Sequence, residues 1–355
     1  MKIGIFTQPL KSNYGGILQN YAMQVVLKRL GHEAWTLDYL RFTWWYWLEI
    51  LLKVTILKCL GRKSKYPPNP ATVQRLETPL RRFAQKYIQL TQPRVKYLNK
   101  SILQSYGFDA LLVGSDQTWR PKYNRIYDMY LQLAEGMNVR RVAYAASFGT
   151  DQWEYTPKQE KECARLVKQF DAVSVREASG VGLCREHFSV EATHVLDPTL
   201  LITTDDYNEL CKDIEKREPF VFAYILDITE QKVAEIKAFA ATQGLPYFIK
   251  SAETGISDVD SIELWLSYFR DAAYVITDSF HGTAFSINYN KEFFVFLNGQ
   301  RGNSRFVSLL SLFNLKDRVV TLVSPEIPEI NWDEVNYMLN SERERCKKWL
   351  ETALN

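Results

Sequence analysis

The residue whose type and setting point most clearly to chemistry is His281, in the segment TDSFHGTAFSIN (277–288). The segment follows the apolar run AAYVI, which predicts that His281 lies where a buried strand ends and a helix begins. The positive end of a helix favours a bound anion, and an imidazole beside that anion can exchange protons near neutral pH. Two interpretations are open: a catalytic acid–base group, or a histidine that only hydrogen-bonds within the turn.

Further polar residues are expected at the same place. Ser279 and Gly282 belong to the predicted turn around the histidine, and Arg301 and Arg305 follow the next predicted strand, KEFFVFLN. In a Rossmann-like order these two arginines can reach the cleft that His281 faces. They are candidates for binding an anionic donor, and the alternative is that they are charges of a solvated loop.

The N-terminal half holds a glycine pair in a comparable position. Gly15 and Gly16 end a polar loop between a predicted strand and a predicted helix, in TQPLKSNYGGILQNYAMQ. Adjacent glycines let a ligand approach the backbone, and the helix start offers N–H groups to it. The pattern is not a dinucleotide fingerprint, so it predicts either a general ligand loop or glycines that serve only the turn.

Two more predicted strands of this half are followed by polar or charged residues. Asp116 and Gln117 follow the apolar run in LLVGSDQTWRP, and Arg176 follows the one in AVSVREASG. Ligands of open α/β sheets bind at such strand ends, and an arginine there can hold a phosphate or carboxylate. The alternatives are a helix cap for Asp116 and an acidic partner for Arg176. Asp197, before a proline in LDPTLL, is interpreted mainly as part of a turn.

Several familiar kinds of site are missing from the sequence. It has no P-loop, no H-E-x-x-H and no G-x-S-x-G motif, and its four histidines are not at metal-ligand spacing. The expectation is therefore that the protein has no metal site and no serine-hydrolase mechanism.

The elements that must position these residues alternate between short apolar strands and helices, which predicts α/β architecture with parallel sheets. The alternation restarts near residue 218, so we expect two Rossmann-like domains that face one another across a cleft. The predicted units are an N-terminal domain over 1–205, a C-terminal domain over 206–328, and a helix over 329–355 that can cross back onto the first domain.

The composition is that of a folded globular protein. The 355 residues are 46% hydrophobic and 24% charged, with a formal net charge of +3, so nothing indicates a nucleic-acid partner. The five cysteines are scattered, which suggests a reducing compartment. The N-terminus enters strand-like sequence directly, which predicts a cytoplasmic rather than a secreted protein.

An aromatic insertion over 42–70 does not fit the α/β rhythm. It begins FTWWYWLEILLKV, and charged residues interrupt it too often for a membrane-spanning helix. Aromatic rings followed by cations are typical of an interfacial anchor. The segment 42–65 is thus expected either to touch the inner face of the plasma membrane or to pack on protein.

Seven segments, taken in order, resemble the polysaccharide pyruvyl transferase family. They are NYGGILQNYAMQ, LLVGSDQTW, YAASFG, SVREASG, LDPTLL, VITDSFHGTAFSI and NSRFVSLL. The resemblance implies a GT-B-like pair of Rossmann domains and transfer of pyruvate from phosphoenolpyruvate onto two sugar hydroxyls as a cyclic ketal. It implies no cofactor beyond that donor substrate, and an acceptor in a bacterial capsule, exopolysaccharide or cell-wall glycan or its lipid-linked precursor.

The family pattern carries over onto two residues, His281 in FHG and Arg176 in VRE. His281 is the expected acid–base group, and Arg176 is expected to bind the donor. From their predicted positions we further expect Ser279, Gly282, Arg301 and Arg305 on the donor side, and Gly15, Gly16, Asp116 and Gln117 on the acceptor side.

One position departs from the family pattern. Ser279 stands where the better-characterised branch has a donor-binding arginine. Either Arg301 or Arg305 replaces that arginine, or the helix start holds the donor, or the donor is a different molecule. Two other functions therefore stay open: a GT-B glycosyltransferase that uses a nucleotide sugar, and a non-catalytic glycan-assembly protein of the same fold.

Overall fold

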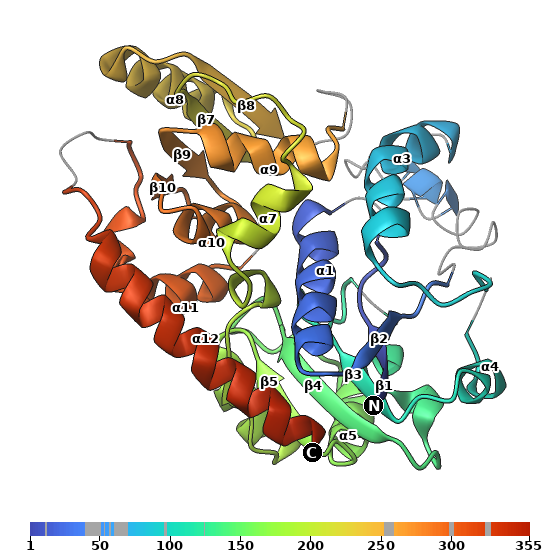
Figure 1. The fold of residues 1–355 in the computed structure, drawn as a ribbon. Helices are drawn as coiled ribbons and strands as arrows, with labels where there is room; N and C mark the ends of the chain where they lie inside the picture. The colour runs from blue at the N-terminus through green and yellow to red at the C-terminus, as the bar shows by residue number, and fades with distance from the viewer. Residues whose placement is uncertain are drawn as a thin grey trace.

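In the computed structural model the chain forms two α/β units, each built around a parallel sheet (Figure 1). The structure describes residues 1–10, 13–39, 51–52, 54–56, 58–59, 70–95, 98–123, 125–251, 259–297, 302–323 and 328–355.

The first sheet has the strand order β2-β1-β3-β4-β5-β6, with all neighbours parallel. Its strands are β1 (Lys2–Phe6), β2 (Glu33–Thr36), β3 (Ala110–Val113), β4 (Arg140–Ala146), β5 (Ala172–Val175) and β6 (Thr193–His194). The accompanying helices are α1 (Tyr14–Arg29), α3 (Pro70–Tyr87), α4 (Lys100–Ser105), α5 (Pro157–Val167) and α6 (Ala178–Leu183). Short helical turns are η1 (Ile126–Tyr130), η2 (Gln132–Ala134), η3 (Cys184–Phe188) and η4 (Pro198–Leu200).

The second sheet has the order β10-β9-β7-β8 and is also parallel throughout. Its strands are β7 (Val221–Ile225), β8 (Tyr247–Ser251), β9 (Tyr274–Thr277) and β10 (Glu292–Val295). The helices are α7 (Thr204–Leu210), which precedes β7, then α8 (Glu230–Gln243), α9 (Ile262–Asp271), α10 (Phe280–Asn288) and α11 (Ser304–Leu312), with the turn η5 (Lys316–Arg318). The two sheets confirm the expected pair of Rossmann-like domains.

The central strands are apolar along their whole length because helices cover both faces of each sheet. All four residues of β3 and all five of β7 are buried. Several helices begin at a side-chain cap, as at Ser261, whose hydroxyl accepts the N–H of Leu264 at 3.2 Å. Helix α8 ends at Gly244, whose left-handed φ of 65° suits glycine.

The C-terminal helix α12 (Trp332–Leu354) crosses back onto the first unit, as expected. In Figure 1 it runs as a long red helix from the second unit to the edge of the first. The N–H of Leu196 donates to Sγ of Cys346 at 3.3 Å, and the guanidinium of Arg140 donates to the carbonyl of Ala353 at 2.6 Å. Arg343 of the same helix donates to the side chain of Asn288 in α10 at 2.7 Å, so the helix ties the two units together.

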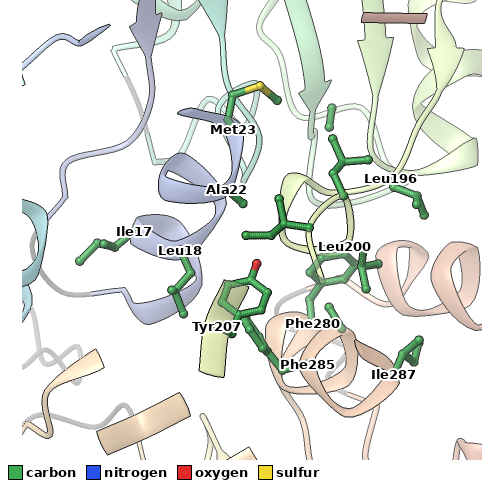
Figure 2. Packing of buried hydrophobic residues seen from close by; sticks show 14 of the residues in the cluster. Ile17, Leu18, Ala22, Met23, Leu196, Leu200, Tyr207, Phe280, Phe285 and Ile287 are labelled. Atoms are coloured by element: carbon green, nitrogen blue, oxygen red, sulfur yellow. The ribbon is translucent and has the colours of Figure 1, made fainter. Parts of the chain in front are cut away.

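A continuous apolar core also joins the units. Leu18 on α1 and Leu200 after β6 belong to the same buried cluster as Tyr207 on α7 and Phe285 on α10. The rings of Tyr207 and Phe285 meet edge to face with centroids 4.9 Å apart. Figure 2 shows these side chains packed between α1, α7 and α10. This packing holds the beginnings of α1 and α10 near one another.

Beyond α11, η5 ends at Arg318, and Val319 forms an isolated parallel bridge with Val295. Most of the insertion 42–70, including its aromatic cluster, lies outside the described residues. No helix among the residues that the structure describes is long and apolar enough to cross a membrane.

Candidate active site

A pocket of about 210 Å³ lies between the two sheets, at the carboxyl ends of their central strands. In the first sheet β1 and β3 are neighbours, but the chain continues from β1 to β2 on one side and from β3 to β4 on the other. The neighbours β7 and β9 of the second sheet diverge in the same way, to β8 and β10. Ligands of open α/β sheets bind at such switch points. The lining residues are Asn13, Gly15, Asp116, Gln117, Tyr224, Leu226, Asp278, Ser279, Phe280, His281, Arg305 and Phe306.

His281 stands in the first turn of α10 and is only 6% exposed. Its ring lies against the backbone of Gly15 at the start of α1, so closely that a Cβ on Gly15 would come within 1.9 Å of Nδ1. On the other side of the ring, Nε2 lies 3.8 Å from the Oδ2 of Asp197. Gly15 therefore acts by making room for the histidine of the opposite domain.

The start of α10 supplies polar groups to the pocket. Ser279 is the N-cap, and its hydroxyl accepts the N–H of Gly282 at 3.3 Å. The earlier N–H groups of the helix have no carbonyl partner within it, so this end attracts an anion. Gly282 does not line the pocket: it packs on Thr277, whose Oγ1 would lie 2.2 Å from an added Cβ.

Asp116 forms the opposite wall and has a left-handed backbone with φ of 71°. Its carboxylate accepts the side-chain N–H of Asn13 at 2.9 Å and the backbone N–H of Gln117 at 2.9 Å. Aspartate tolerates this conformation better than most residues, and such strain is typical of binding sites. The carboxylate is thus held in a fixed place at the pocket.

Gln117 and Gly16 have different surroundings although both were expected at the acceptor side. Gln117 lines the pocket, and its side-chain oxygen accepts a hydrogen bond from Arg120 at 2.9 Å. Gly16 is buried in α1 beside the side chain of Asn13 and does not line the pocket.

Arg176 was expected to hold a donor anion, yet its guanidinium does not line the pocket. It donates to Asp197 at 2.8 Å, lies 3.4 Å from Asp116, and stacks 4.3 Å from the ring centre of Phe280. Burial by itself would lower the pKa of Arg176, but the two carboxylates raise it above its usual value. Arg176 is therefore paired with buried acids, which was the alternative to binding a donor.

Asp197 is the residue that the sequence reasoning missed, because a turn before proline explained it locally. Its carboxylate is fully buried and accepts hydrogen bonds from Ser115, Arg176 and Thr199 at 2.7 to 2.9 Å. Burial would raise the pKa of Asp197, but His281 and Arg176 hold it well below its usual range. A permanent negative charge therefore faces the candidate acid–base histidine.

Arg305, at the start of α11, is the arginine that lines the pocket. Burial and repulsion from Arg176 lower its pKa to about 10, so it stays charged at neutral pH. The carboxylates of Asp116 and Glu177 partly offset this lowering. Arg301, the other candidate of this connection, lies outside the described residues.

The pocket has charges of both signs and no arrangement typical of a metal site. Arg305 and the α10 start lie on one side, and the carboxylates of Asp116 and Asp278 lie around them. Within the described ranges, no group of three or more His, Cys, Asp and Glu side chains could hold a metal ion. The arrangement suits an anionic ligand next to a hydroxyl-bearing one.

Comparison with solved structures finds remote likenesses over nearly the full chain. The UDP-GlcNAc 2-epimerase from Neisseria meningitidis is 11% identical over 98% of this chain and 94% of that one, with a TM-score of 0.44. The UDP complex of MnaA from S. aureus is 11% identical over 99% and 90%, with a TM-score of 0.47. The wall teichoic acid polymerase TagF is 10% identical over 99% and 82%, with a TM-score of 0.43.

The sequence itself is more informative about ancestry. No curated protein matches the chain. The model of the family described as polysaccharide pyruvyl transferase matches residues 13–300, a range that contains both walls of the pocket except Arg305 and Phe306. The chain therefore belongs to the polysaccharide pyruvyl transferase family.

Proposed function

We propose that this protein transfers pyruvate from phosphoenolpyruvate onto two hydroxyls of a sugar, in a surface glycan or its lipid-linked precursor, as a cyclic ketal. The observation that carries the proposal is the small pocket in which His281, the start of α10 and Arg305 converge from the second domain. These three groups provide a proton carrier beside a site for a compact anion.

Arg305 and the α10 start take over the donor contacts that an arginine at position 279 would make. Ser279 lines the pocket, and its short side chain caps the N–H of Gly282, so it takes less room at the helix start than an arginine would. Arg305 contributes a buried guanidinium whose fork geometry matches phosphate and carboxylate. Phosphoenolpyruvate carries both of these groups.

The reaction needs two proton movements that balance. One sugar hydroxyl adds to the central carbon of the enolpyruvyl group, and its proton ends on the methylene carbon, which becomes a methyl group. The second hydroxyl then attacks the same carbon, the bond from that carbon to the phosphate oxygen breaks, and the second proton leaves with phosphate. His281 carries these protons, and Arg305 stabilises the departing phosphate charge.

The acceptor sugar is proposed to lie against the first domain. Asp116 and Gln117 offer oxygen acceptors to sugar hydroxyls, and Asn13 adjoins them on the same wall. Since Asp116 is held by Asn13 and by a backbone N–H, its carboxylate can orient a hydroxyl toward His281.

The size of the pocket favours this donor over a nucleotide sugar. Its volume of about 210 Å³ lies below the roughly 300–1,000 Å³ of sites that enclose drug-sized ligands. Phosphoenolpyruvate is much smaller than a nucleotide sugar and suits such a space better.

The donor can be tested by thermal shift with phosphoenolpyruvate and, separately, with a panel of nucleotide sugars. We expect phosphoenolpyruvate to raise the Tm of the wild-type protein and Arg305→Ala to abolish that increase. Arg305→Lys, which keeps the charge but not the fork, should retain part of it. Arg176→Ala is a poorer probe, because it leaves Asp197 and Asp116 as buried charges without their cation and destabilises the fold.

Stabilisation by a nucleotide sugar and not by phosphoenolpyruvate would contradict the proposal and favour the glycosyltransferase. Stabilisation by neither class would favour the non-catalytic glycan-assembly protein.

A further inference from the structure

We propose that Asp197 is a positioning residue that keeps the proton of neutral His281 on Nε2, so that Nδ1 is the nitrogen that serves the reacting groups. This inference rests on the proposed function for its catalytic meaning. Its structural part, the protonation site of His281, is independent of the donor.

The two ring nitrogens of His281 have different surroundings. Nε2 is fully buried and has no hydrogen-bond partner among the described residues, and the Oδ2 of Asp197 lies 3.8 Å away. Nδ1 lies on the side of the ring that meets Gly15, and both residues line the pocket. A neutral imidazole has one N–H, and a lone pair on Nε2 would face a carboxylate oxygen and be repelled. The proton therefore belongs on Nε2.

Asp197 is suited to this role because it is immobile. Thr199 donates to Oδ1 through its backbone N–H and its hydroxyl, while Ser115 and Arg176 donate to Oδ2 at 2.8 Å. These bonds fix the carboxylate in one orientation with Oδ2 toward the histidine. Small movement of the α10 start would shorten the 3.8 Å gap to a hydrogen bond, as catalytic contacts tighten when a ligand binds.

Asp197 differs from the other charged groups near His281. Arg305 shares the pocket wall with the histidine, and Arg176 lies behind it on Asp197. Asp116 and Asp278 also line the pocket, but Asp278 is paired with Lys232 at 2.7 Å. Asp197 is the carboxylate that lies against Nε2 itself, so it stabilises the ring directly when Nδ1 also becomes protonated.

The proton path follows from this arrangement. The imidazolium of His281 first donates its Nδ1 proton to the methylene carbon, which leaves the central carbon oxocarbenium-like and the ring neutral with Nε2–H toward Asp197. As the first sugar hydroxyl attacks that carbon, Nδ1 takes up the hydroxyl proton and the imidazolium is restored. Asp197 keeps its negative charge throughout and accepts no proton, because three donors and its low pKa hold it ionised.

The protonation site can be observed directly by NMR. The chain has only four histidines, so long-range ¹H–¹⁵N correlation spectra of ¹⁵N-histidine-labelled protein are simple to assign with single variants. We expect neutral His281 in the wild-type protein to show a protonated Nε2 and an unprotonated Nδ1. An Nδ1–H form of His281 in the wild-type protein would overturn the inference, and this result needs no variant to fold.

Asp197→Asn tests the cause, because it keeps the shape and removes the charge. We expect the His281 spectrum to change and kcat to fall about 100-fold, the upper effect of removing a residue that orients a catalytic group, with little change in KM for the donor. A matched control is Glu160→Gln, which alters the carboxylate that contacts His187 at 3.0 Å, away from the pocket. It should change only the signals of His187 and leave kcat unchanged.

The outcomes separate this inference from the proposed function. If His281 carries its proton on Nε2 but the protein does not use phosphoenolpyruvate, the positioning role of Asp197 is supported and the proposed donor is wrong. If the protein uses phosphoenolpyruvate but Asp197→Asn keeps full kcat and unchanged His281 signals, the donor is supported and the positioning role is wrong.

Discussion

Replacing His281 by glutamine is expected to lower turnover about 10³-fold, within the range by which general acid–base groups accelerate reactions. Glutamine fills similar space in the narrow gap between Gly15 and Asp197 but cannot carry a proton between hydroxyl and carbon. The Tm should fall by a few degrees only, because the apolar core between α1 and α10 remains. Steady-state rates and thermal unfolding of the same preparation measure both effects.

His187→Gln is the matched control for this substitution. His187 is half-buried, stacks on Trp153 with ring centres 3.7 Å apart and contacts Glu160, but it does not line the pocket. Its replacement should change the Tm by a similar amount and leave turnover intact. If the His281→Gln protein kept full turnover, the histidine would be a structural residue and the proposed proton path would fail.

The second large effect is expected from Gly15→Ala. The new methyl group would lie 1.9 Å from Nδ1 of His281, so the histidine or the whole start of α10 must move. A misplacement of this size costs about 10²-fold in rate, and forced overpacking costs about 1–3 kcal/mol of unfolding free energy. Both kcat and the free energy of unfolding should therefore fall together.

Gly16→Ala distinguishes this contact from a general effect of glycine loss. The two glycines are adjacent in α1, but the atoms nearest to an added Cβ on Gly16 belong to the side chain of Asn13, at 3.1 Å or more. That side chain can shift slightly, and alanine favours the helix by up to about 1 kcal/mol. Gly16→Ala should therefore be near neutral for stability, and equal losses in both variants would contradict the role given to Gly15.

Much of the site could be predicted because each residue lies at the carboxyl end of a parallel strand. Gly15 and Asp116 follow β1 and β3, and Ser279 and His281 follow β9. Apolar runs locate these strands in the sequence, and parallel pairing brings their ends to one edge. The two strand orders then place both edges at the same pocket.

The remaining features depend on tertiary contacts that no local pattern records. Asp197 fits a turn before proline, and only the fold brings its carboxylate to Arg176 and His281. Arg176 likewise lies at a strand end where an arginine could bind a ligand, but in the fold its guanidinium pairs with two buried acids, Asp116 and Asp197. Gly282 serves helix packing on Thr277, which strand and helix periodicity cannot reveal.

The central claim, pyruvyl transfer from phosphoenolpyruvate, is tested most directly by following the donor carbon. Phosphoenolpyruvate labelled with ¹³C at the methylene carbon would be incubated with the protein and a panel of saccharides that present neighbouring and 1,3-related free hydroxyls. We expect the methylene signal to be replaced by a methyl signal attached to a ketal carbon, with one phosphate released for each ketal and neither change with His281→Gln. A methylene signal that persists with every saccharide, together with nucleotide release from a nucleotide sugar, would contradict the claim.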